Sequence, residues 1–140
     1  MTQFLPVWAS LLRGLPVLLL HVAATTCLWL AGWRAACLLI PRGNASESAS
    51  PGHAHAVLSG AEALAFAVPL AACLAGSINV ADILLWGGVV VLLQLLFSAA
   101  SRFGWRGLAG LIREGRVDTA IHVALLRNGF ALISAAAVSG

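Results

Sequence analysis

Uncharged apolar stretches of membrane-spanning length constrain this chain more than any other feature of its sequence. Leu15 to Trp33 is nineteen residues without a formal charge, bounded by Arg13 and Arg34. Nineteen helical residues rise about 28 Å, close to the hydrocarbon thickness of a bilayer, roughly 30 Å. A cleaved signal peptide is the alternative, although the stretch exceeds the usual signal length and no small-x-small site follows before Arg34. We therefore expect a first membrane-spanning helix over 15–40.

The composition of the whole chain also points to lipid as its solvent. The 140 residues have a mean hydropathy of +0.97, and 61% are hydrophobic while only 9% are charged. A soluble domain carries about a quarter charged residues, which are needed to cover its surface. The net charge of +3 comes from arginines that border apolar stretches, so it is a topology signal and not a nucleic-acid footprint. We expect the lipid bilayer as a partner and no nucleic acid.

Three further apolar segments follow the first, separated by polar ones. The expected segments are an interfacial, outward-facing 1–14, a loop at 41–55 rich in Ser, Gly and Pro, spans at 56–78, 83–101 and 119–140, and an Arg-rich loop at 102–118. Asp82 lies where the third span begins and favours the positive end of its helix dipole. The expected fold class is an all-α membrane protein of four transmembrane helices in one domain.

The arginines predict the orientation of these spans. Four spans place the first and third connections on the same side of the membrane. Those connections hold six arginines, Arg34, Arg42, Arg102, Arg106, Arg113 and Arg116, whereas the other side holds Arg13 alone. Because short Arg-rich loops stay in the cytoplasm, both termini are expected to be periplasmic.

An internal repeat is also predicted. Shifting the chain by sixty-four residues aligns the second span with the fourth, with Phe66 on Phe130 and Gly76 on Gly140 among six identities in twenty-one positions. Ala-rich helices also match by accident. The spacing agrees with the number of spans and predicts two tandem helical hairpins, a parallel repeat.

Part of the chain resembles a known family through the order of three short motifs. They are Pro69-Leu70, Asp82-x-x-x-Trp86-Gly87 and Gln94-Leu95. With the flanking segments, from about Ala56 to the C-terminus, the chain resembles the YjfL-like family of small bacterial inner-membrane proteins, a domain-of-unknown-function family. The resemblance implies four spans, envelope-associated operons and no established activity. No functional residue is assigned from the resemblance, because Glu62, Arg127 and Asn128 stand where the family has small or apolar residues.

Two charges inside the spans are the first candidate site. Glu62 lies six residues past Ala56 and Arg127 seven past Ala120, so each is about 10 Å beyond the cytoplasmic end of its helix. An isolated charge at this depth is costly, and an opposite charge at the same depth relieves the cost. We expect Glu62 and Arg127 to pair. The pair, with Asn128, either lines a proton or ion path or forms a structural clasp, and Arg127 reaching the phosphates is a further alternative.

Two other sets of polar residues stand out. The third span has a face of small and hydrogen-bonding residues, which membrane helices present to one another; these are Gly87, Gln94, Ser98 and Ser101. The Arg-rich loop can reach anionic headgroups; its basic residues are Arg102, Arg106, Arg113 and Arg116.

Patterns typical of enzymes and metal sites are not found in the sequence. His53 and His55 are two residues apart and do not share a helical face, and Cys27, Cys37 and Cys73 match no metal or redox spacing. The sequence has no Walker loop, dinucleotide-binding glycine pattern or catalytic triad pattern. We expect no metal, no cofactor and no enzyme activity, and we expect His21 to be neutral and bonded to a carbonyl or to Thr25.

The resulting functional expectation is a small scaffold or subunit of an envelope-associated assembly in the bacterial inner membrane. Four spans leave little room for a substrate cavity in one chain, so a homo-oligomer or a complex with membrane or peripheral subunits is expected. The alternative is a small ion- or proton-coupled transporter or channel in which Glu62 titrates.

Overall fold

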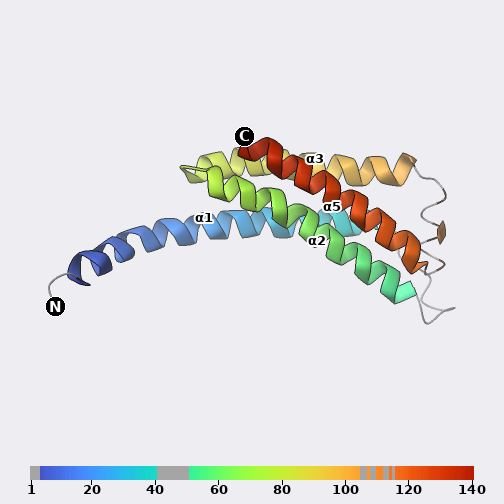
Figure 1. The fold of residues 1–140 in the computed structure, drawn as a ribbon, viewed down its shortest axis with the longest axis horizontal. Coiled ribbons are helices and arrows are strands. Elements are labelled where there is room, and N and C mark those ends of the chain that lie inside the picture. The colour runs from blue at the N-terminus through green and yellow to red at the C-terminus, as the bar shows by residue number, and fades with distance from the viewer. Residues whose placement is uncertain (1–3, 41–50, 105–106, 108–109, 112–113, 115) are drawn as a thin grey trace.

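The described part of the chain folds into four long α-helices (Figure 1). The computed structural model describes residues 4–40, 51–104, 107, 110, 111, 114 and 116–140. Its long helices are α1 (Phe4–Leu39), α2 (Pro51–Gly76), α3 (Val80–Gly104) and α5 (Val117–Ser139). Each contains a segment long and apolar enough to cross a membrane, and the described residues contain no strand. The chain is thus an all-α, multi-pass membrane protein.

Three helices begin three or more residues earlier than expected, and α3 also ends later, at Gly104 inside the segment 102–118 expected as a loop. α2 begins at Pro51, inside the segment 41–55 expected as a loop, because proline suits the first helical position, where no N–H is needed. α1 begins at Phe4 and not at residue 15, so residues 4–14 continue the first span as one helix. Pro16 removes one backbone hydrogen bond and does not end α1, which is tolerated in membrane helices. α3 begins at Val80, where the Asn79 side chain caps it by accepting from the Asp82 N–H (3.0 Å).

The helices that run in the same direction pack together. α2 makes its largest interface with α5, and α1 makes its largest with α3, while α3 and α5 touch little. One end of the bundle, the loop end, contains the C-terminal ends of α1 and α3 and the starts of α2 and α5. The other end, the turn end, contains the tight 77–79 connection and the end of α5. The predicted tandem repeat stays a prediction.

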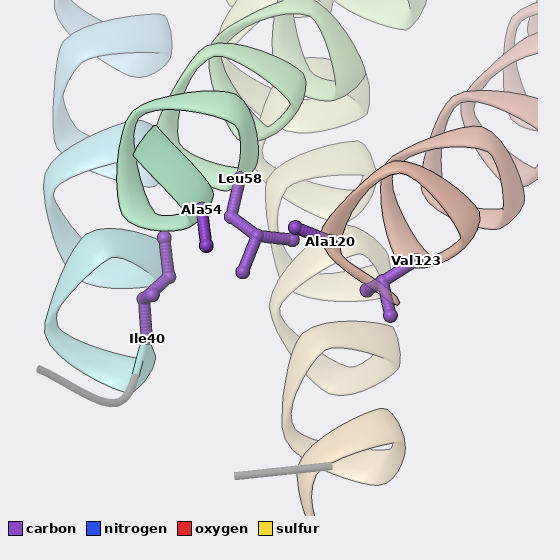
Figure 2. Close-up of a cluster of buried hydrophobic side chains, with 5 residues drawn as sticks. All are labelled: Ile40, Ala54, Leu58, Ala120 and Val123. Atoms are coloured by element: carbon purple, nitrogen blue, oxygen red, sulfur yellow. The ribbon is translucent and has the colours of Figure 1, made fainter. Parts of the chain in front are cut away.

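Small buried clusters hold the bundle together. At the loop end, Figure 2 shows side chains from α2 and α5, and from the residue that follows α1, meeting in one cluster of Ile40, Ala54, Leu58, Ala120 and Val123. Nearer the middle, Phe66 and Leu70 of α2 pack with Ala36 of α1. Gly32 of α1 allows this approach, because a Cβ there would lie 2.8 Å from the Phe66 ring. Phe66 is fully buried, so α1 can lie this close to its ring only because residue 32 has no side chain.

The N-terminal half of α1 extends beyond the bundle. Leu28 lies level with Gly87 and Leu70, because a Cβ on Gly87 would meet both leucines. Leu70 is six residues, about 9 Å, from the end of α2, and the same distance along α1 leads from Leu28 to about residue 22. We call residues 8–22 of α1 the α1 arm. Trp8 and residues 10–20 are all exposed, and Figure 1 shows this part of α1 projecting past the other helices.

Candidate functional site

Glu62 and Arg127 form an ion pair in the middle of the bundle. The Nη2 of Arg127, on α5, donates to Oε2 of Glu62, on α2. Both residues are buried, with 6% and 2% of their surfaces exposed. Because α2 and α5 begin earlier than the spans expected from sequence, each charge lies about 15 Å from the start of its helix, near mid-membrane. The pairing at equal depth is the arrangement that the sequence predicts.

A third helix joins the pair through Ser98. Arg127 uses its other terminal nitrogen, Nη1, to donate to the Ser98 hydroxyl oxygen on α3. Ser98 in turn donates to the Gln94 carbonyl one turn earlier (2.9 Å). Arg127 therefore links α2, α3 and α5 with one side chain. This link matters because α3 and α5 otherwise share few contacts.

Two phenylalanines shield the arginine. Phe97 of α3 stacks on Phe130 of α5 with ring centroids 4.3 Å apart and planes 6° from parallel. The guanidinium carbon of Arg127 lies 5.7 Å from the Phe97 ring centroid, within cation–π range. The aromatic pair thus adds an apolar contact and a favourable electrostatic one beside the buried charge.

The polar face of α3 is buried as a continuous stripe. Gly87, Gln94 and Ser98 are all buried, and Gln94 is fully so. The Gln94 amide donates to the hydroxyl oxygen of Ser134 on α5 at 3.5 Å, and Ser134 donates to the Phe130 carbonyl (2.9 Å). Gln94 and Ser98 therefore supply the side-chain hydrogen bonds between α3 and α5 in the described residues.

Three buried polar atoms lack a partner among the described residues. They are Nε of Arg127, Oε1 of Gln94 and Nδ1 of His55. Arg127 and Gln94 belong to the network just described, and His55 lies seven residues before Glu62, on the same side of α2. Such atoms are normally satisfied, and a buried water is the usual partner.

Asn128 does not join the ion pair. Its side-chain amide donates to the Ala124 carbonyl of its own helix (2.9 Å), and it is only partly buried. The reason is angular: Arg127 lies on the buried face of α5, and the next residue is rotated about 100° around the helix. The proposed association of Asn128 with Glu62 and Arg127 is not seen.

The Arg-rich loop is described only in part. Arg106 and Arg113 lie outside the described residues, and Arg102 lies in the last turn of α3 without a described side chain. Arg116, just before α5, is exposed and donates to both carboxylate oxygens of Asp118, from Nε (3.3 Å) and Nη2 (2.8 Å). The Asp118 carboxylate raises the pKa of the Arg116 guanidinium. Arg116 is therefore paired within the chain.

Several contacts have no counterpart in the sequence predictions. The indole of Trp29 donates to the Ala63 carbonyl (2.8 Å), and that of Trp33 donates to the Ser59 carbonyl (3.0 Å), so two α1 side chains fasten α2. The two rings stack with centroids 5.7 Å apart. Their spacing of four residues was the available signal, because it places both indoles on one helical face.

His21 makes the expected carbonyl contact, from Nδ1 to Val17 O at 2.7 Å.

The described residues offer no group of three His, Cys, Asp or Glu side chains that could hold a metal. Cys27 is exposed, Cys37 is partly buried and Cys73 is buried, and all three are free thiols.

Comparison with known proteins identifies the family. A model of the domain of unknown function DUF350 matches residues 10–138. The chain belongs to the DUF350 family. The match includes all the residues of the ion-pair network and most of the α1 arm. No curated protein and no solved structure gives a significant match to the chain. Membership in DUF350 agrees with the expected uncharacterised membrane family, whereas the YjfL-like assignment and a bacterial source stay predictions.

Proposed function

We propose that the chain is a structural subunit of a membrane assembly, without enzyme activity, that joins its neighbours through the α1 arm. The observation that carries this proposal is the exposure of Trp8 and of residues 10–20 of the arm. Its apolar side chains include Leu11, Leu12, Leu15, Val17, Leu18, Leu19 and Leu20, all of them exposed. Apart from Arg13, residues 11–20 carry no charge, and a helix with so many exposed apolar side chains belongs in lipid or against another protein. The arm extends past its own bundle, where the other three helices provide no cover.

The buried network supports a static role for the rest of the chain. Arg127 bonds Glu62 and Ser98 and faces Phe97, so its charge joins three helices. A paired, hydrogen-bonded charge fixes the register of the helices that it joins. The bundle would then act as a rigid base that presents the arm. We take a second copy of the chain as the partner, because symmetric homo-oligomers are the commonest assemblies.

Disulfide scanning tests this assembly. In a chain with Cys27, Cys37 and Cys73 replaced by Ala, single cysteines placed along the α1 arm are oxidised in native membranes. We expect linked dimers at positions spaced three or four residues apart, because one face of each arm meets its partner. Single cysteines at Leu125 and Ile133, exposed on α5, are the matched controls and should give little product. Equally weak linkage at every arm position would contradict the proposal.

We place the chain in a bacterial inner membrane with both termini in the periplasm. The support is that α1 and α3 end, and α2 and α5 begin, at the same end of the bundle, and the sequences that join them contain arginines. We expect a periplasm-active reporter fused after Gly140 to be active and the same reporter fused near Ser48 to be inactive. The reverse pattern would place the loop end outside.

A proton-coupled transporter is the second candidate, and the unpartnered buried atoms favour it. Arg127 Nε, Gln94 Oε1 and His55 Nδ1 are buried without a described partner, so ordered water could connect them along the bundle. The test is a proton flux assay with purified protein in vesicles that contain a pH-sensitive dye. The transporter requires flux in the wild type and its loss in Glu62→Gln, with Asn128→Ala as the control. No flux in the wild type would eliminate this candidate.

A further inference from the structure

A cavity of about 470 Å³ opens at the turn end of the bundle. Three helices and the 77–79 connection line it: Cys73 and Gly76 from α2, Ser77 and Ile78 from the connection, Asp82 and Trp86 from α3, and Ala137 and Val138 from α5. Figure 1 shows the C-terminal end of α5 beside this connection. The volume falls in the range of small-molecule sites, roughly 300 to 1,000 Å³. The cavity lies at the C-terminal end of α5, and neither Glu62 nor Arg127 lines it.

The oxygens around this cavity are acceptors that require a donor. The Ser77 hydroxyl donates its hydrogen to the Cys73 carbonyl (2.5 Å), so its oxygen can only accept from a further group. Among the described residues, nothing forms an ion pair or a hydrogen bond with the Asp82 carboxylate. The Asp82 carboxylate lies in the first turn of α3, at the edge of a membrane span, and has no ion-pair or hydrogen-bond partner within the described chain.

The indole of Trp86 adds a second preference for positive charge. Asp82 and Trp86 are four residues apart, so they lie on the same face of α3 and both line the cavity. Tryptophan is the strongest cation–π partner, and a carboxylate with an aromatic ring is a suitable pair for an ammonium group. The Asn79 cap, which accepts from the Asp82 N–H, fixes the turn that carries these groups. An anion is disfavoured, because the Asp82 carboxylate stands at the first turn of α3.

The position of the cavity favours a lipid over a soluble amine. The candidate span of α2 ends at Gly76 and that of α3 begins at Val80. The cavity therefore lies at the level of the headgroups. Ala137 and Val138 give it an apolar wall, while Ile78 and Trp86 are 92% and 54% exposed and so are accessible from the bilayer. We propose that this cavity binds the ammonium group of an amine-bearing membrane lipid, with Asp82 and Trp86 as the recognising side chains. The site is independent of the assembly through the α1 arm.

Native mass spectrometry of the full-length, delipidated protein in micelles tests this site. The probes are phosphatidylethanolamine and phosphatidylglycerol with identical acyl chains. We expect phosphatidylethanolamine to bind about tenfold more tightly, and we expect Asp82→Asn to remove most of this preference. Trp86→Leu should weaken the binding of phosphatidylethanolamine by several-fold and leave the binding of phosphatidylglycerol unchanged. Glu114→Gln, an exposed acid before α5, is the matched control and should change neither.

Three results would overturn the proposal. The first is equal binding of the two lipids by the wild type, and the second is an unchanged preference in both Asp82→Asn and Trp86→Leu. The third is displacement of the lipid by free ethanolamine at equal concentration, which would assign the site to a soluble amine. Thermal unfolding of each variant establishes that it is folded, and Trp86→Leu supplies the result if Asp82→Asn does not fold.

Discussion

Replacing Glu62 by Gln is expected to lower the free energy of unfolding by about 3–5 kcal/mol, the range for breaking a buried ion pair. The variant leaves the Arg127 guanidinium buried without an opposite charge, hydrogen-bonded to the neutral Ser98 hydroxyl. Arginine stays protonated in proteins, so the charge cannot be removed by losing a proton. The measurement is chemical unfolding of the purified protein in mixed micelles.

Arg127→Gln is expected to be less severe than Glu62→Gln. The remaining Glu62 carboxylate can bind a proton and become neutral, which reduces the cost of leaving it buried. The loss of stability in Arg127→Gln should therefore grow as the pH rises, since a proton must be bound against a lower proton concentration. Asn128→Ala is the control, because its amide bonds only the Ala124 carbonyl. It should change stability by about 1 kcal/mol or less. Equal stability of Glu62→Gln and Asn128→Ala would show that the pair contributes little.

Gly32→Ala is expected to destabilise the bundle by about 1–3 kcal/mol, the usual cost of overpacking. The added Cβ would lie 2.8 Å from two carbons of the Phe66 ring and 3.2 Å from Val91 Cγ1. Phe66 is fully buried and its ring is rigid, so α1 has to move away from α2. The Trp29 and Trp33 indole hydrogen bonds to α2 would lengthen with that movement.

Gly14→Ala provides the matched control on the same helix. A Cβ at Gly14 would have nothing within 4 Å, so the substitution adds no contact and gains helix propensity. We expect Gly14→Ala to be at least as stable as the wild type in thermal unfolding. If Gly32→Ala unfolded at the wild-type temperature, the close approach of α1 to Phe66 would not be present in the protein.

The sequence predicts the membrane spans well because the bilayer imposes one length on each of them. Composition alone separates four apolar segments, and the structure has a long helix in each. The boundaries are less predictable, because they depend on single residues. Pro51 starts α2 inside a polar segment, and α1 begins at Phe4 and continues through Pro16.

The ion pair is predictable because two opposite charges occur at equal depth in helices that run the same way. Its surroundings are not, since they depend on the rotation of each helix and on which helices are neighbours. Ser98 was assigned to a packing face, yet it accepts from Arg127, and Asn128 points away because it is one position further around α5. The exposed α1 arm was not predicted either, because hydropathy cannot distinguish a helix inside a bundle from one that leaves it.

A double-mutant cycle on Glu62→Gln and Arg127→Gln tests most directly the claim that these two residues act as one structural unit. The free energies of unfolding of the wild type, both single variants and the double variant are measured under the same micelle conditions. We expect the double variant to be more stable than the sum of the two single losses by about 1–3 kcal/mol, because the second substitution removes the unpaired charge left by the first. Losses that simply add would contradict the account, because each side chain would then contribute without the other.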